Sequence, residues 1–213
     1  MTDSTYTLYY APGTASMVVH LALLEAGVPY RLERVDFAAE AQRDPGYLKL
    51  NPHGQVPTLL IDGRPLTESA ALLMILADRH PETPLAPAHG TVEHEAWQQW
   101  IVYLSNTLMS TYRLWFYPAE LGATEHLPEV RVALQRKIEG VWDRLETHLA
   151  THGPYLLGAQ FSGADLLLTM LLRWSRNMPR PATAWPALKQ LADRVRARPS
   201  WQKLYELEGL SEW

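Results

Sequence analysis

One stretch of this chain, residues 51–71, constrains its fold more than any other part of the sequence. Asn-Pro and Gly mark a turn at its start, and the short apolar segment 58–61 is typical of a buried strand. An Asp-Gly pair then predicts a tight hairpin with a short returning strand. A helix is expected to begin at Ser69 and to run to about residue 80, so the stretch predicts strand, hairpin, strand and helix.

Val56-Pro57 lies directly before the first of these predicted strands. A proline cannot donate to a strand ladder, so this pair predicts a tight turn with a cis peptide bond. Such a turn leaves the peptide of Val56 free as donor and acceptor. The helix start at Ser69 offers free N–H groups and a partial positive charge. The stretch therefore predicts a receptor for a small extended peptide that carries carboxylates.

The segments before this stretch complete an α/β unit. Residues 5–10 predict a strand, residues 16–26 a helix that ends at Gly27, and residues 30–36 a second strand. A strand, helix and strand over so few residues imply a parallel pair with a right-handed crossover. The full order, β-α-β followed by β-β-α and ending near residue 80, is typical of the thioredoxin-like fold.

The second half of the chain predicts helices only. A proline-rich linker separates it from the α/β unit, so the predicted domains are residues 1–81 and 91–213, joined by a linker at 82–90. Ser162 and Asp165 have capping-box spacing at the start of a helix that is apolar almost all round. The apolar periods predict helices that cover residues 97–117, 134–152, 164–174, 186–198 and 200–208.

Composition limits the function classes. The chain has 213 residues, of which 47% are hydrophobic and 20% charged, and its net charge of -4 argues against nucleic acid as a main partner. It has no cysteine, so any thiol chemistry needs a thiol that the substrate brings. No apolar run is long enough to span a membrane, and a cytoplasmic location is expected. The histidines lack metal-ligand spacing, and no metal site is predicted.

The chain resembles the cytosolic glutathione transferases, and most closely their bacterial beta-like members. The resemblance covers nearly the whole chain and rests on four motifs in the family's order, Leu8–Gly13, Gln55–Pro57, Leu66–Ser69 and Phe161–Asp165. It implies a thioredoxin-like α/β N-terminal domain with an all-α C-terminal domain. It also implies glutathione as co-substrate, an apolar electrophile as second substrate, and a homodimer.

The resemblance also implies which residues bind glutathione. Val56 is expected to pair its backbone with the cysteinyl unit, and Glu68 to meet the γ-glutamyl ammonium group. Ser69 is expected to take the γ-glutamyl carboxylate. His53 occupies a position where beta-like members often have a lysine for the glycine carboxylate. The implied glutathione-binding residues are His53, Gln55, Val56, Pro57, Glu68 and Ser69.

The chain departs from the beta-like members where they act on the thiol. Ala15 stands where they have a cysteine, and Met109 stands where they have a histidine. These departures leave stabilisation of the thiolate by a hydroxyl, for which the candidates are Tyr9, Tyr10, Thr14 and Ser16. Ser16 is favoured because it lies at a helix start, Tyr10 is second and Thr14 third. The residues expected to line the electrophile pocket are Thr14, Met109, Tyr112, Trp115 and Phe116.

Two classes of function stay open at this level. The first is an enzyme that conjugates the glutathione thiolate to apolar electrophiles, or a related glutathione-dependent peroxidase, dehalogenase or isomerase. The second is a transferase-like scaffold that binds glutathione or a partner without turnover, which the missing cysteine and histidine make possible. A thioredoxin-like redox protein is nearly excluded because the chain has no dithiol.

Overall fold

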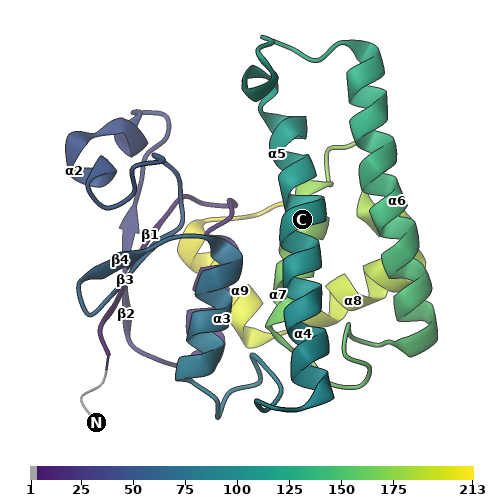
Figure 1. The fold of residues 1–213 in the computed structure, drawn as a ribbon, viewed down its shortest axis with the longest axis horizontal. Helices are drawn as coiled ribbons and strands as arrows, with labels where there is room; N and C mark the ends of the chain where they lie inside the picture. The colour runs from purple at the N-terminus through teal and green to yellow at the C-terminus, as the bar shows by residue number, and fades with distance from the viewer. Residues whose placement is uncertain (1–3) are drawn as a thin grey trace. The chain divides into compact units, whose positions relative to one another are not determined.

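The computed structural model describes residues 4–213, shown in Figure 1. By packing they form two units, which we call the sheet unit (residues up to Ala86 together with Arg196–Trp213) and the helical unit (Pro87–Val195). The last helix therefore groups with the sheet unit, whereas the sequence assigned it to the second domain. The boundaries predicted from the sequence stay a prediction, and residues 1–3 of the first predicted domain lie outside the described residues.

A four-stranded mixed sheet forms the centre of the sheet unit. The strands are β1 (Tyr6–Tyr10), β2 (Tyr30–Arg34), β3 (Thr58–Ile61) and β4 (Arg64–Leu66). Their order is β2-β1-β3-β4, and β1 pairs parallel with β2 and antiparallel with β3. Tyr6, Leu8 and Tyr10 alternate with half-buried residues, so one face of β1 is fully covered. The thioredoxin-like sheet that the sequence predicts is confirmed.

The helices of the sheet unit are α1 (Met17–Ala26), α2 (Pro45–Leu48), α3 (Ser69–Arg79) and α9 (Pro199–Glu208), with a 3-10 turn at Ala41–Arg43. Helix α1 packs against both α3 and α9 and is buried along most of its length. It ends at Gly27, which has a φ of 66° and donates its N–H to the carbonyl of Leu24. Glycine suits this left-handed position because it has no Cβ.

The helical unit contains α4 (Val92–Tyr103), a π-helical segment (Leu104–Met109), α5 (Ser110–Phe116), α6 (Pro128–His152), α7 (Gly163–Trp174), α8 (Pro186–Arg196) and 3-10 turns at Pro118–Leu121 and Ala182–Ala184. The sequence predicted one regular helix through residues 97–117, but the π segment interrupts it. The extra residue of a π turn rotates the following side chains around the helix axis, which the apolar period alone does not reveal. None of the helices within residues 4–213 has the length and apolar character needed to cross a membrane.

Helix α7 begins with the capping box that the sequence predicts. The Asp165 carboxylate accepts the N–H groups of Ser162 at 2.8 Å and Leu156 at 2.9 Å, and it is fully buried. Burial raises the pKa of Asp165 to about 6, and the hydrogen bonds from its neighbours oppose that rise. The pair therefore serves folding, as its spacing indicates.

Candidate functional site

The loop before β3 presents a free peptide group. The Val56-Pro57 bond is cis, as the sequence predicts. The carbonyl of Gln55 accepts hydrogen bonds from the Asn51 side-chain amide at 2.7 Å and from the hydroxyl of Tyr47. Neither the N–H nor the carbonyl of Val56 has a hydrogen-bond partner among residues 4–213. The loop is thus held through Gln55, while the half-buried Val56 peptide is available to an extended ligand.

The residue before α3 has an unusual backbone conformation. Glu68 has a φ of 72°, in the region that side chains rarely adopt, and its side chain is exposed. Ser69 is buried, and its hydroxyl donates to the carbonyl of Ala15 at 2.9 Å. Because that hydroxyl is occupied, a ligand carboxylate at this helix start would meet backbone N–H groups of the first turn.

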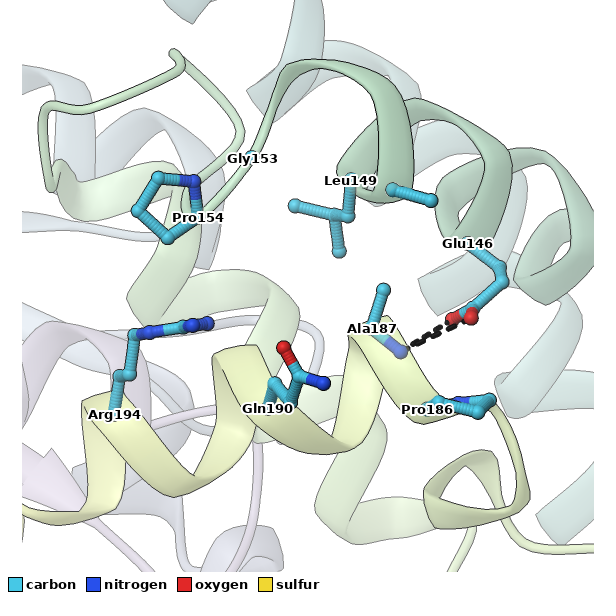
Figure 2. A pocket seen from close by; sticks show the side chains of 9 residues that line it. Glu146, Leu149, Gly153, Pro154, Pro186, Ala187, Gln190 and Arg194 are labelled. Atoms are coloured by element: carbon cyan, nitrogen blue, oxygen red, sulfur yellow. Dashed lines mark hydrogen bonds between the residues drawn. The ribbon is translucent and has the colours of Figure 1, made fainter.

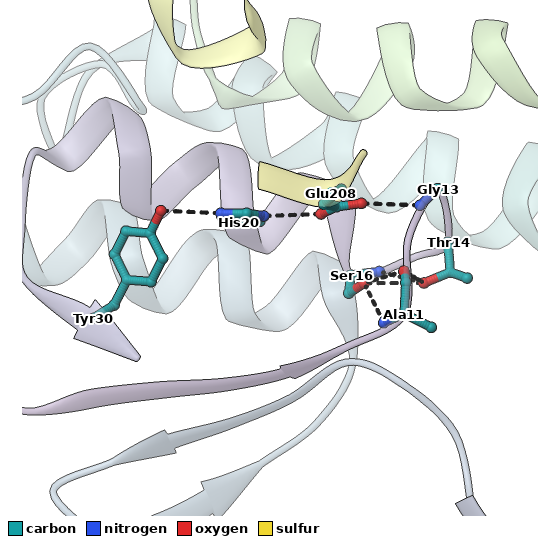
Figure 3. Close-up of polar contacts among 7 residues, drawn as sticks. All are labelled: Ala11, Gly13, Thr14, Ser16, His20, Tyr30 and Glu208. Carbon is teal, nitrogen blue, oxygen red and sulfur yellow. Dashed lines mark hydrogen bonds and ion pairs between the residues drawn. The ribbon is translucent and has the colours of Figure 1, made fainter. Parts of the chain in front are cut away.

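The turn between β1 and α1 is the second half of the site, and Ser69 ties it to α3 through Ala15. The hydroxyl of Thr14 donates to the carbonyl of Ala11 at 2.7 Å, and that of Ser16 donates to the same carbonyl at 3.1 Å. The two hydroxyls lie 3.0 Å apart, and Ser16 also accepts the N–H of Ala11 at 3.3 Å (Figure 3). The two hydroxyl groups of the turn therefore hydrogen-bond to its backbone and lie within hydrogen-bond distance of each other.

The sequence-predicted hydroxyl donors differ in access. Ser16 is fully buried, whereas Thr14 is half-buried and is the member of the pair nearer solvent. Tyr10 is only 8% exposed, and its ring lies 6.1 Å from that of His20 in α1, on the covered face of the sheet. Exposure therefore favours Thr14 over Ser16 and Tyr10 as the group that can meet an incoming sulfur.

The two polar residues expected at the glycine end of the ligand lie on the open side of the loop. His53 and Gln55 are both exposed. The His53 N–H donates to the Asn51 side-chain oxygen at 3.1 Å, so the backbone there is ordered while the imidazole is accessible. The structure thus brings His53, Gln55 and Val56 together on one loop.

The residues expected to line the electrophile pocket belong partly to the helical unit. Tyr112 and Trp115 are buried, Met109 ends the π segment, and Phe116 is 47% exposed. The rings of Tyr112 and Phe116 stack at 5.6 Å. Burial raises the pKa of Tyr112 far above its ordinary range, so its phenol stays protonated. Phe116 is therefore the most accessible aromatic ring of this set.

An open pocket of about 570 Å³ lies elsewhere in the helical unit, between the end of α6 and α8 (Figure 2). None of the residues predicted to contact the electrophile lines it. Its Glu146 carboxylate accepts the N–H groups of Ala187 at 2.9 Å and Leu188 at 3.1 Å, so it caps α8. The Glu146 carboxylate is therefore already hydrogen-bonded to the first N–H groups of α8.

The sequence reasoning missed a buried row of polar groups in the sheet unit. The hydroxyl of Tyr30 lies 3.0 Å from Nε2 of His20, and Nδ1 of His20 lies 2.8 Å from the carboxylate of Glu208. The other oxygen of Glu208 accepts the N–H of Gly13 at 2.9 Å. Figure 3 shows Glu208 between His20 and the turn. Only a histidine on an otherwise apolar helix signals this row in the sequence.

The comparisons with known proteins agree with one another. Residues 4–77 match the description "Glutathione S-transferase, N-terminal domain", and residues 112–202 match "Glutathione S-transferase, C-terminal domain". Glutathione S-transferase GST-4.5 of Xanthomonas campestris pv. campestris is 32% identical over 212 residues, which cover 96% of this chain and 99% of that protein.

Solved structures give the same result. The ternary complex of BphK, a bacterial GST, is 36% identical with a TM-score of 0.85, and the match covers 96% of this chain and 100% of that one. A sphingomonad glutathione S-transferase complexed with glutathione is 29% identical with a TM-score of 0.85, over 96% of this chain and 100% of that one.

Proposed function

This chain belongs to the glutathione S-transferase family, and we propose that it transfers the glutathione thiolate to apolar electrophiles. The observation that carries the proposal is the unpaired Val56 peptide in the sheet unit, which also presents the open helix start at Ser69. A tripeptide with a free carboxylate at its γ-glutamyl end matches both features. In the reaction, the sulfur forms a bond to an electrophilic carbon, and a leaving group departs with the bonding electron pair.

Recognition of glutathione rests on backbone groups and on a few charges. Val56 pairs with the cysteinyl peptide, and Pro57 holds that geometry. Glu68 accepts the γ-glutamyl ammonium group, and the first N–H groups of α3, beginning at Ser69, receive the γ-glutamyl carboxylate. His53 and Gln55, both exposed on the same loop, serve the glycine end.

Activation of the thiol rests on the turn between β1 and α1. A thiol with a pKa of about 8.5 is mostly protonated at neutral pH, so a hydrogen bond to the thiolate is needed to raise its population. We infer that the Thr14 hydroxyl turns from the carbonyl of Ala11 to the thiolate when glutathione binds, and that the Ser16 hydroxyl turns from the same carbonyl to Thr14, 3.0 Å away. A hydrogen bond to a charged group contributes about 1.5–3 kcal/mol, enough to lower the thiol pKa by about one to two units.

The thiol pKa is the direct test of this function. The ultraviolet absorbance of the bound glutathione thiolate would be titrated with pH in wild type, Ser16→Ala and Tyr10→Phe. We expect a depressed pKa in wild type, a partial return in Ser16→Ala and no change in Tyr10→Phe. Glutathione that binds with its solution pKa would overturn the proposal and favour a binding scaffold.

The second substrate and the assembly are further parts of the proposal. Thr14, Met109, Tyr112, Trp115 and Phe116 are proposed to line the electrophile pocket, with Phe116 as the accessible ring. A homodimer is proposed because it is typical of the family. Light scattering checks it directly, and a monomer at micromolar concentration would contradict it.

A further inference from the structure

Glu208, the last residue of α9, is buried inside the sheet unit, and both of its carboxylate oxygens accept hydrogen bonds. Its side chain and that of His20 are both 0% exposed. A buried carboxylate is costly unless its oxygens accept hydrogen bonds. One oxygen takes His20 Nδ1 at 2.8 Å and the other takes the N–H of Gly13 at 2.9 Å, so each oxygen has a donor.

The hydrogen bond between His20 and Glu208 has a defined direction. A carboxylate only accepts, so Nδ1 of His20 carries the proton that faces Glu208. In the neutral imidazole, Nε2 then accepts the hydroxyl proton of Tyr30, 3.0 Å away. Burial, and after it the negative charge of Glu208, raises the pKa of Tyr30 to about 12, so this phenol keeps its proton at neutral pH. Tyr30 and His20 therefore orient the Glu208 carboxylate.

The far end of the row is the turn that carries the hydroxyl pair. Gly13 has a φ of 71°, which glycine adopts readily, and it directly precedes Thr14. The N–H of Met17 is bonded to the carbonyl of Thr14 at 3.1 Å, so the position of the turn also sets the start of α1. A shift at Gly13 would therefore displace the Thr14 hydroxyl.

Docking of α9 onto α1 alone does not need Glu208, because a second cluster joins the same two helices. The carboxylate of Glu25 in α1 accepts two hydrogen bonds from Arg198, each at 2.7 Å, and one from Ser200. These three hydrogen bonds join Glu25 to the start of α9, whereas Glu208 lies at its end. The two clusters differ in one respect, which is that Glu208 bonds to the segment that bears Thr14 and Ser16.

We propose that Glu208 is a positioning residue for thiol activation: by holding the N–H of Gly13, it sets the Ala11–Ser16 turn so that the Thr14 hydroxyl meets the glutathione sulfur. This role rests on the proposed function. It assigns no contact between Glu208 and the substrate. It joins the C-terminal helix to the chemistry through one backbone hydrogen bond.

The test compares variants of the two clusters in the full-length chain. The pKa of the bound thiol would be measured at saturating glutathione, together with kcat and KM for a chromogenic electrophile and thermal melting. Glu208→Ala is expected to raise the thiol pKa by about one unit, a roughly threefold to eightfold loss of thiolate at neutral pH, with a lower kcat and little change in KM for glutathione. Glu25→Ala, the matched control, is expected to lower the melting temperature and leave the thiol pKa unchanged.

Glu208→Gln supplies the rescue. Its amide oxygen can accept the N–H of Gly13, and its amide N–H can donate to His20 once the imidazole takes the other tautomer. We expect this variant to keep most of the depressed pKa. Glu208→Met fills a similar volume without an acceptor, so it gives the same readout if the alanine variant does not fold.

The outcomes separate this role from the proposed function. If the wild-type chain binds glutathione without a depressed thiol pKa, the proposed function fails and the positioning role fails with it. A depressed wild-type pKa that Glu208→Ala and Glu208→Met leave unchanged overturns the positioning role alone. A pKa that rises in these variants and is restored by Glu208→Gln supports it.

Discussion

The loop that holds Val56 and the turn that holds Thr14 lie in the same unit but are built in different ways. The loop is held by neighbours in sequence, since Asn51 and Tyr47 are four and eight residues from Gln55. Besides its own hydroxyl bonds, the turn is held by Ser69, which is 54 residues from Ala15, and by Glu208, which is 195 residues from Gly13. The geometry of the loop proposed to bind glutathione is thus encoded locally, whereas the turn proposed to activate the thiol is fixed by contacts that only folding creates.

The largest expected effect concerns a buried acid whose partners are all local. Asp165 has a pKa of about 6 in the folded chain against an ordinary value of 3.8, so the folded state binds this proton more tightly than the unfolded state. The stability that comes from this group is therefore present below about pH 4 and is lost as pH rises through about 6. We expect the free energy of unfolding to fall by about 3 kcal/mol over that range relative to Asp165→Asn.

Denaturant unfolding of wild type and Asp165→Asn at several pH values measures this difference. Parallel pH profiles for the two chains would show that the buried carboxyl does not titrate in this window. The thiol pKa of bound glutathione should be the same in both, because the capping box belongs to neither half of the site.

Glu68→Ala tests the recognition half. Loss of a charge-assisted hydrogen bond to the γ-glutamyl ammonium group costs about 1.5–3 kcal/mol, so the Kd for glutathione should rise roughly tenfold to a hundredfold. Calorimetric titration measures it, and Glu68→Gln, which keeps an acceptor without the charge, should lie between. An unchanged Kd in the alanine variant would remove Glu68 from the recognition site.

Thr14→Val tests the activation half with a side chain of nearly the same shape. The bound thiol pKa should rise by about one unit, or about 1.4 kcal/mol, while the Kd for glutathione measured at low pH stays nearly constant. Thr14→Ser keeps the hydroxyl and should resemble wild type. If Ser16→Ala raises the pKa and Thr14→Val does not, Ser16 is the group that contacts the sulfur.

Ser69→Ala is expected to give the smallest effect. It tests most directly whether the recognition half and the activation half depend on each other, because Ser69 hydrogen-bonds the start of α3 to the turn. Its hydroxyl donates to the carbonyl of Ala15, so the variant loses about 1 kcal/mol of stability. We expect small changes in both the Kd for glutathione and the thiol pKa, detected by the same two titrations. A change in the Kd alone would mean that the turn does not depend on α3.

The recognition half could be predicted from the sequence because its signals are local. The Val56-Pro57 pair, the Asp-Gly hairpin and the helix start at Ser69 each report backbone geometry over a few residues, and all three were found where expected. The order of strands and helices followed from the same kind of evidence. The left-handed φ of Glu68 has no such signal, because its side chain does not favour that region.

The activation half could not be predicted to the same depth. The sequence placed candidate hydroxyls in the turn between β1 and α1, and it ranked Ser16 first on its helix position. The structure buries Ser16 behind Thr14, and burial depends on how the whole turn packs. The π segment before Ser110 likewise changes which faces of the long helix are covered.

By itself, the sequence determined the thioredoxin-like sheet, the helical second half and the cis-proline loop before β3, which rest on propensity, periodicity and turn chemistry between near neighbours. The glutathione transferase family followed from the resemblance of its motifs. The tertiary structure decided which hydroxyl is accessible, and it joined His20, Glu208 and Gly13 into one buried row. Such a row forms only when α9 returns to α1, because burial makes each polar group depend on partners far away in the chain.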